Sequence, residues 1–195
     1  MFIALGGCGA AMLQAWLPRL AESDLTVAID RAGRQQERSS GIRHVFGLHG
    51  IRMQGACAEH AEAARCEVAR AIEAEWLRID ACLDEGSSVV LLAGLGGVVG
   101  SWGAVEIGNR LVARGLDVTA MLAMPFAFEG ERVKMARAAL AAMPAFPRQV
   151  LCRNDYLIRH APKGASMEEA FGVMNDKAWE LLFGGGSGYQ THVTS

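Results

Sequence analysis

The sequence predicts an α/β fold: a three-layer, doubly wound and mainly parallel sheet of six strands. Short apolar runs alternate with longer segments that have the periodicity of amphipathic helices. The clearest run, residues 88–93, is continuously apolar, as a strand buried on both faces of a parallel sheet requires. Glycine-rich turns follow two of the runs. Strands joined by helices of ten or more residues form right-handed crossovers, which gives this architecture.

The expected elements alternate along the whole chain. Strands are expected at residues 2–5, 25–29, 44–48, 88–93, 118–124 and 149–152. Helices are expected at about residues 10–21, 58–85, 104–114, 131–142 and 166–183. Ser166 and Glu169 have the spacing of a helix capping box. We expect one domain over residues 1–183 and a flexible glycine-rich tail over residues 184–195.

Composition excludes several classes of protein. The chain has 195 residues, is 51% hydrophobic and 21% charged, and has a net charge of −2. These values are unlike those of disordered chains, and no basic surplus exists to bind nucleic acid. No apolar stretch approaches the ~20 residues of a membrane span. Five scattered cysteines without CxxC spacing predict reduced thiols in a cytoplasmic protein, and five histidines without metal-ligand spacing predict no metal site.

Two glycine-rich turns predict a ligand crevice at one edge of the sheet. The first is residues 6–9, and the second is residues 94–103. Each lies between a strand and a helix, where backbone amides can face an anion. Packing of helix on strand explains the first turn equally well when it is taken alone, whereas two such turns at one edge of the sheet favour a nucleotide crevice. No Walker motif is present, while Asp30 keeps an NAD-type Rossmann domain as an alternative.

Five segments resemble motifs of one known family, in the same order along the chain. Residues 93–101, AGLGGVVGS, are similar to the family's signature loop A-G-x-G-G-G-T-G-[ST]-G. Residues 124–130, MPFAFEG, resemble its P-F-x-F-E-G segment, and residues 153–157, RNDYL, its P-N-D-x-L segment. Residues 170–176, AFGVMND, resemble the start of its central helix, and residues 6–9, GGCG, are similar to G-Q-C-G. The family is that of the tubulin and FtsZ GTPases, and the resemblance covers residues 2 to about 183.

The resemblance implies a site for GTP or GDP, with Mg²⁺ only when GTP binds. The residues that it assigns to the phosphates, and in the first turn also to the nucleoside, are Gly6, Gly7, Cys8, Gly9, Gly96, Gly97, Gly100 and Ser101. Glu129 would hold the ribose hydroxyls and Asn154 the nucleoside. Phe171 would lie against guanine. Asp176 would accept hydrogen bonds from the N1–H and the amino group of guanine, a donor pair that adenine lacks. Without the resemblance, Phe171 is interpreted as a core residue and Asp176 as part of a solvated helix face.

Three residues depart from the signature loop. Val98, Val99 and Trp102 stand where the family has its third glycine, its threonine and its final glycine. Valine tolerates unusual backbone angles poorly, and a tryptophan adds bulk where a phosphate would lie. The expectation is therefore weak or vestigial GTP binding, with the nucleoside end retained better than the phosphate end. In the alternative, these side chains fill the crevice. The family's third glycine-rich loop is reduced to residues 55–59.

The resemblance also limits the expected activity. Family members continue past the central helix into a loop with catalytic carboxylates and a second domain, whereas residues 184–195 contain no Asp or Glu. No catalytic residue is assigned and no self-activated hydrolysis is expected. The expected function is filament assembly or co-assembly, with the chain itself or a related FtsZ-like protein as partner, and with a membrane only through a partner. The alternatives are a GTPase completed in trans by another chain and a nucleotide-free scaffold.

Overall fold

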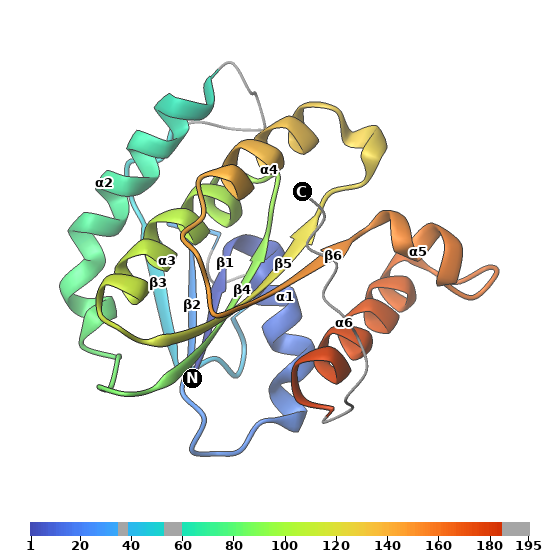
Figure 1. Cartoon of the computed structure of the whole chain (residues 1–195), viewed down its shortest axis with the longest axis horizontal. Helices are drawn as coiled ribbons and strands as arrows, with labels where there is room; N and C mark the ends of the chain where they lie inside the picture. Colours follow the sequence, from blue (N-terminus) through green and yellow to red (C-terminus); the bar gives the residue numbers. More distant parts are fainter. Residues whose placement is uncertain (35–38, 53–59, 185–195) are drawn as a thin grey trace.

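The fold is a six-stranded, entirely parallel sheet between two layers of helices (Figure 1). The computed structural model describes residues 1–34, 39–52 and 60–184. The strands are β1 (Phe2–Leu5), β2 (Thr26–Arg31), β3 (His44–Leu48), β4 (Ser88–Gly94), β5 (Asp117–Met124) and β6 (Arg148–Arg153). Their order in the sheet is β3-β2-β1-β4-β5-β6. The chain therefore reverses its direction of travel between β1 and β4, and ligands of such sheets bind at this switch point.

Helices cover the two faces of the sheet unequally. One face carries α1 (Gly6–Trp16) and α6 (Met167–Phe183), and the other carries α2 (Ala61–Asp80), α3 (Ala104–Ala113) and α4 (Glu131–Ala141). Each face has its own hydrophobic core. In β1, Ile3 and Leu5 belong to the α2–α4 core, whereas Phe2 and Ala4 belong to the α1–α6 core. This alternation shows that the strand is buried on both sides.

The first helix differs from the prediction at both ends. It begins at Gly6, so residues 6–9 form its first turn rather than a separate turn before residue 10. It ends at Trp16 and continues only as the 3-10 turn η1 (Leu17–Arg19). Pro18 explains the early end, because proline has no backbone N–H to continue the helix.

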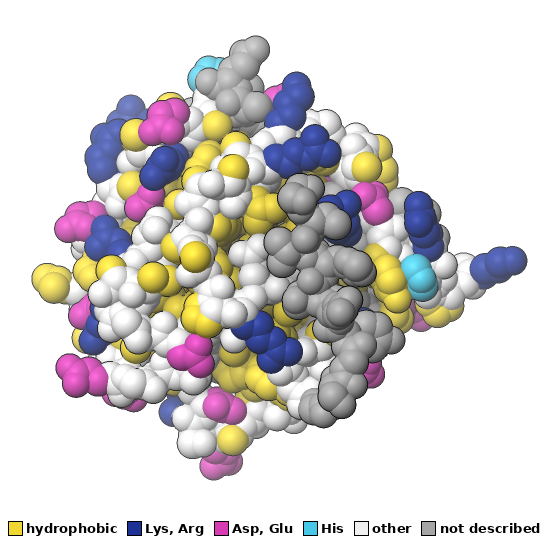
Figure 2. Space-filling model, viewed as in Figure 1, with side chains coloured by type: hydrophobic (Ala, Val, Ile, Leu, Met, Phe, Trp, Pro, Cys, Tyr) yellow, Lys and Arg dark blue, Asp and Glu magenta, His cyan; other side chains and the backbone are white. Residues whose placement is uncertain are grey.

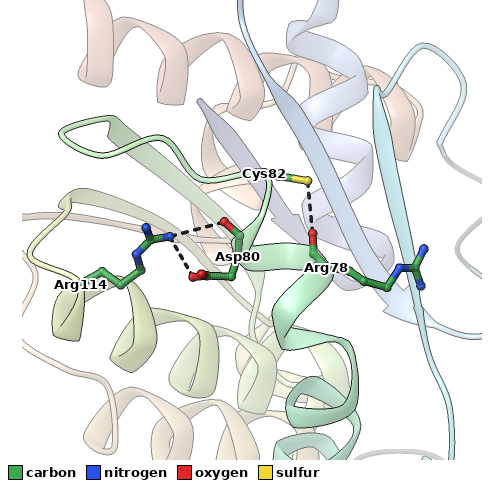
Figure 3. Close-up of polar contacts among 4 residues, drawn as sticks. All are labelled: Arg78, Asp80, Cys82 and Arg114. Atoms are coloured by element: carbon green, nitrogen blue, oxygen red, sulfur yellow. Dashed lines mark hydrogen bonds and ion pairs between the residues drawn. The ribbon is translucent and has the colours of Figure 1, made fainter.

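Helices α2 and α3 are linked along their length by three ion pairs. Arg65 pairs with Glu106, Arg110 with Glu73, and Arg114 with Asp80. At the last of these, the Arg114 guanidinium is 2.8 Å from Asp80 Oδ1 and 3.5 Å from its backbone oxygen (Figure 3). Close by, the Cys82 thiol donates to the Arg78 carbonyl, and burial raises the pKa of this thiol. Among the described helices, none is both long and apolar enough to cross a membrane.

The C-terminal helix α6 begins as the sequence predicts. The Ser166 hydroxyl accepts from the Glu169 amide, and the Glu169 carboxylate accepts from the Ser166 amide. Farther along, the Trp16 indole donates to the Asn175 carbonyl at 3.0 Å and packs edge-on against Trp179. These contacts fix α6 against α1. The short helix α5 (Asp155–His160), which precedes α6, is not predicted from the sequence.

Candidate functional site

The two glycine-rich turns meet at the switch point of the sheet. Gly6 follows β1 and residues 95–100 follow β4, and these two strands are neighbours. A Cβ atom added to Gly6 would lie 3.1 Å from the Gly100 amide nitrogen. One added to Gly100 would lie 2.1 Å from the Gly94 carbonyl oxygen. The two backbones are therefore in close contact, and the backbone at Gly100 leaves no room for a side chain.

The same close packing extends along the start of α1. A Cβ atom on Gly94 would lie 2.3 Å from the Cys8 Cβ, and one on Gly9 would lie 2.5 Å from the Leu92 carbonyl oxygen. Gly9 is buried, whereas Gly7 is half-buried and Cys8 is exposed. The first turn of α1 thus packs against β4 through Gly9, whereas Gly7 and Cys8 are accessible to solvent at the edge of the sheet.

The turn after β4 is closed by a buried hydroxyl. Gly96 has a φ of 92°, which strongly favours glycine, and its amide donates to the Ser101 Oγ at 2.8 Å. Ser101 is fully buried, so its side chain serves the turn itself. Gly97 differs from its neighbours, because it is half-buried and a Cβ added there would meet nothing within 4 Å. Gly97 is therefore the point where this turn faces open space.

The residues that depart from the signature loop are helical and face the core, contrary to the expected conflict. Val98 has φ −58° and ψ −55°, which any L-residue adopts, and it leads into the π-helical turn η3 (Val99–Gly103). Val98, Val99 and Trp102 are 8%, 6% and 3% exposed and belong to the α2–α4 core. The expectation that they strain the loop or add bulk in the crevice is therefore wrong. Their spacing places them on the helix face that the sheet and α2 cover.

The helix ends at this edge differ in charge. Neither α1 nor η3 has an acidic residue in its first turn or a side-chain N-cap. Helices α2 to α6 each have an acidic residue there. A helix N-terminus has a partial positive charge of roughly half an electron. The two uncompensated N-termini lie together at the contact between Gly6 and Gly100.

Glu129, the predicted ribose ligand, is engaged by its own loop. Its Oε1 accepts from the Phe126 amide at 2.8 Å, and its Oε2 lies 2.6 Å from the Arg132 guanidinium. Arg132 also flanks the turn after β4, since a Cβ atom on Gly96 would lie 2.9 Å from the Arg132 carbonyl. The start of α4 therefore touches the turn after β4, and Arg132 both makes this contact and holds Glu129.

Asn154 presents an unsatisfied acceptor. Its Oδ1 is buried and has no hydrogen-bond partner among the described residues. The backbone N–H of Asn154 donates to the Met124 carbonyl at 3.2 Å, which fixes the residue beside the end of β5. A buried oxygen without a donor costs about 1–3 kcal/mol, so a ligand hydroxyl or amine at this point would be stabilised.

The remaining two predicted residues lie on α6. Phe171 is half-buried and contacts Phe126, with ring centroids 6.4 Å apart. Asp176 is exposed, and its carboxylate pairs with Arg19, which follows the end of α1. The structure thus brings Phe171 to the loop after β5 but directs Asp176 to η1.

Asp30 was the residue that favoured the alternative of an NAD-type Rossmann domain, and its carboxylate accepts from the Arg31 amide at 2.7 Å. Residues 55–59 lie outside the described part of the chain.

Sequence reasoning missed the arginine partners of the two carboxylates. Arg132 has the i,i+3 spacing from Glu129 that favours an ion pair, so a local signal was present. Arg19 and Asp176 are 157 residues apart, and no local pattern connects them. Among the described residues, no cluster of His, Cys, Asp and Glu is arranged to hold a metal ion.

Solved structures show what this arrangement resembles. No protein-family model matches the sequence. The chain is similar to an empty FtsZ dimer from M. jannaschii, with 20% identity and a TM-score of 0.66 over 93% of this chain and 52% of that one. It is similar to CetZ from Methanosaeta thermophila, with 19% identity and a TM-score of 0.68 over 93% of this chain and 52% of the CetZ chain. A PhuZ201 filament matches with 13% identity and a TM-score of 0.66 over 98% and 58%.

The chain spans just over half the length of these structures. At these identities the likeness concerns the fold. The chain therefore has the α/β fold of these FtsZ, CetZ and PhuZ201 structures, as the resemblance of its five motifs predicted.

Proposed function

We propose that the protein binds a guanine nucleotide weakly at the switch point and works in filament assembly or co-assembly. The observation that supports this most directly is the contact of Gly6 with Gly100, where two helix N-termini without acidic residues converge. Such N-termini attract phosphate through backbone amides and their partial charge. The fold is also that of an FtsZ dimer and a PhuZ201 filament.

In this proposal the phosphates lie over Gly97 and the open side of the first turn of α1. The buried Asn154 oxygen would accept from the nucleoside, and Phe171 would contact the base. Mg²⁺ would enter only with GTP, whose phosphate oxygens would supply ligands that the described side chains do not gather. Hydrolysis without a partner is not part of the proposal.

Isothermal titration with GTP, GDP and ATP tests this site. The informative variant is Gly97→Asp, because its side chain would project into open space and repel a phosphate. We expect GTP and GDP to bind at least tenfold more weakly to this variant. The variant should remain folded, because a carboxylate near a helix N-terminus is favourable. Ala138→Asp, on the exposed side of α4, is the charge-matched control.

Three outcomes are decisive for the nucleotide site. Equal binding of GDP to the Gly97→Asp and Ala138→Asp variants would place the nucleotide elsewhere. Preference for GDP over ATP, lost in Asp176→Asn, would support the guanine role of that carboxylate. No heat with any nucleotide would favour the scaffold alternative.

One observation favours the nucleotide-free scaffold as a second candidate. The carboxylates of Glu129 and Asp176 are both paired with arginines, so guanine and ribose would have to displace guanidinium groups. Sedimentation with and without GTP separates the candidates. Assembly that depends on GTP supports the first, and identical assembly in its absence supports the scaffold. Phosphate release with a related FtsZ-like protein would indicate a GTPase completed in trans.

A further inference from the structure

A second cleft lies on the outer side of the sheet, between β6, α5 and α6. It has a volume of about 560 Å³, within the range of ligand sites. Its apolar part consists of Leu151 and Cys152 from β6 and Met174 and Leu181 from α6. Burial raises the pKa of the Cys152 thiol to about 11, so this group lines the cleft in its neutral form.

The cleft follows the edge of the outermost strand. Successive side chains of a strand point to opposite faces, yet the consecutive residues Leu151, Cys152 and Arg153 all line it. It therefore extends along the strand's edge, which carries the backbone groups that do not pair with β5. In the described part of the chain, β6 pairs with β5 alone. A free edge of this kind can pair with another extended chain.

The rim of this cleft is cationic. Arg153 and Arg159 are exposed, and no ion pair or side-chain hydrogen bond with the described residues holds either guanidinium group. The other charged groups are compensated, since Lys177 pairs with Glu180 and the Asp155 carboxylate accepts from the Ala127 amide. Figure 2 shows dark blue and cyan side chains beside yellow apolar surface over α5, at the right of the view. The rim therefore favours an anionic occupant.

A wall of the cleft is formed by two stacked rings on α5. Tyr156 and His160 lie with their centroids 3.6 Å apart and an angle of 7° between their planes. The His160 Nδ1 is 2.9 Å from the Tyr156 carbonyl, which holds the pair in place. Both residues face the cleft, so an apolar side chain seated there would contact a flat aromatic surface.

Topology and charge argue against two occupants, namely residues 184–195 of the same chain and the β6 edge of a second copy. The crossovers β4–α3–β5 and β5–α4–β6 run on the α2–α4 face, whereas α6 lies on the α1 face. A parallel strand after α6 beside β6 would make a left-handed crossover, which is very rare. Residues 184–195 also contain no acidic residue. A second copy paired antiparallel along the whole of β6 would set the exposed Arg153 of one copy opposite the exposed Arg148 of the other, so like charges would meet at both ends of the pair.

We propose that the β6 edge binds an extended acidic segment of a partner protein, which adds to the sheet as a seventh strand. Its alternate apolar side chains would lie on Met174 and Leu181, which belong to the α1–α6 face, and on the Tyr156–His160 wall. Its acidic side chains would face Arg153 and Arg159. This site is separate from the proposed nucleotide site and does not depend on it.

Fluorescence anisotropy with a labelled eight-residue peptide that alternates valine with glutamate or aspartate tests the proposal on the full chain. We expect saturable binding that weakens with salt, and none for the peptide with lysine in place of the acids. Arg153→Ala/Arg159→Ala should weaken binding at least fivefold, and Arg153→Lys/Arg159→Lys should restore most of it. Arg70→Ala/Arg137→Ala removes the same charge from the opposite face and should leave binding unchanged.

Backbone pairing has its own test. One peptide is N-methylated at every valine and another at every acidic residue. Alternate residues of a strand direct their N–H groups to opposite edges, so each peptide lacks the donors of one edge. We expect the peptide that lacks the donors facing β6 not to bind. Hydrogen exchange at the outward amides of β6 should slow when the unmodified peptide is bound. Binding of both methylated peptides, or equal binding of the lysine peptide, would overturn the proposal. A third result would also overturn it: outward β6 amides that are protected from hydrogen exchange in the free chain and that lose this protection when residues 185–195 are removed.

Discussion

The two ends of the candidate nucleotide site are built by different means. At the phosphate end, backbone packs on backbone, and Gly9 and Gly100 approach neighbouring carbonyl oxygens closely enough to exclude any side chain. At the nucleoside end, Glu129 and Asp176 are held by ion pairs with Arg132 and Arg19, whose side chains are 53% and 39% exposed. Exposed ion pairs contribute about 0–1 kcal/mol, so they exchange partners readily. The phosphate end is thus preorganised, and the nucleoside end is adjustable.

The largest effect is expected from Gly100→Ala. Its Cβ would lie 2.1 Å from the Gly94 carbonyl oxygen, and backbone on both sides leaves little room to shift. We expect the free energy of unfolding to fall by about 3 kcal/mol or more, measured by urea denaturation. The control is Gly172→Ala in α6, where nothing lies within 4 Å and where alanine should stabilise the helix by about 0.5–1 kcal/mol. Equal effects of the two changes would remove the distinction between the two ends.

Ser101→Ala tests whether the turn depends on its buried hydroxyl. The change leaves the Gly96 amide without its acceptor in a buried position. A loss of about 1–3 kcal/mol in the free energy of unfolding is expected. Ser88→Ala, at an exposed position with a 3.4 Å contact to Asp117, should change it by less than about 0.5 kcal/mol. A neutral Ser101→Ala would mean that close glycine packing alone holds the turn.

Ser166→Ala removes the cap of the helix that carries Phe171 and Asp176. The expected loss is about 1 kcal/mol at pH 7, measured by urea denaturation. Hydrogen bonds from Ser166 lower the pKa of Glu169, so this group stabilises the fold above its unfolded pKa. That contribution disappears as the pH falls through the lowered pKa. The difference between wild type and Ser166→Ala should therefore be smaller near pH 3, and a constant difference would contradict the coupling.

The smallest effect is expected from the ion pair at the nucleoside end. A double-mutant cycle of Arg19→Ala and Asp176→Asn should give a coupling energy of at most about 1 kcal/mol, reduced further in 0.5 M salt by screening. The cycle uses the single variants as controls, because Arg19 also lies 5.6 Å from the Trp179 ring centroid. A coupling above about 2 kcal/mol would show that this pair is fixed and would contradict an adjustable nucleoside end.

The sequence by itself determined the sheet and most of its connections. The continuous apolar run of β4, the Ser166 cap and the paired glycine turns are local features, and each reports on its immediate surroundings. Local patterns also indicated which loops would meet, because the carboxyl ends of parallel strands lie at one edge. The start of α1 was predicted four residues late, because glycine has low intrinsic helix propensity and tertiary packing overrode it.

Only the tertiary structure decided what the departures from the signature loop mean. In the sequence alone, Val98, Val99 and Trp102 suggested that the phosphate-binding loop had lost its function. In the structure their side chains belong to the α2–α4 core and their backbone is helical. The sequence likewise gave no indication that Asp176 would meet Arg19, or that β6, α5 and α6 would enclose a cationic cleft. The physical reason is common to these cases. Side-chain direction and long-range partners depend on how helices pack on the sheet, and no local period of the sequence records that packing.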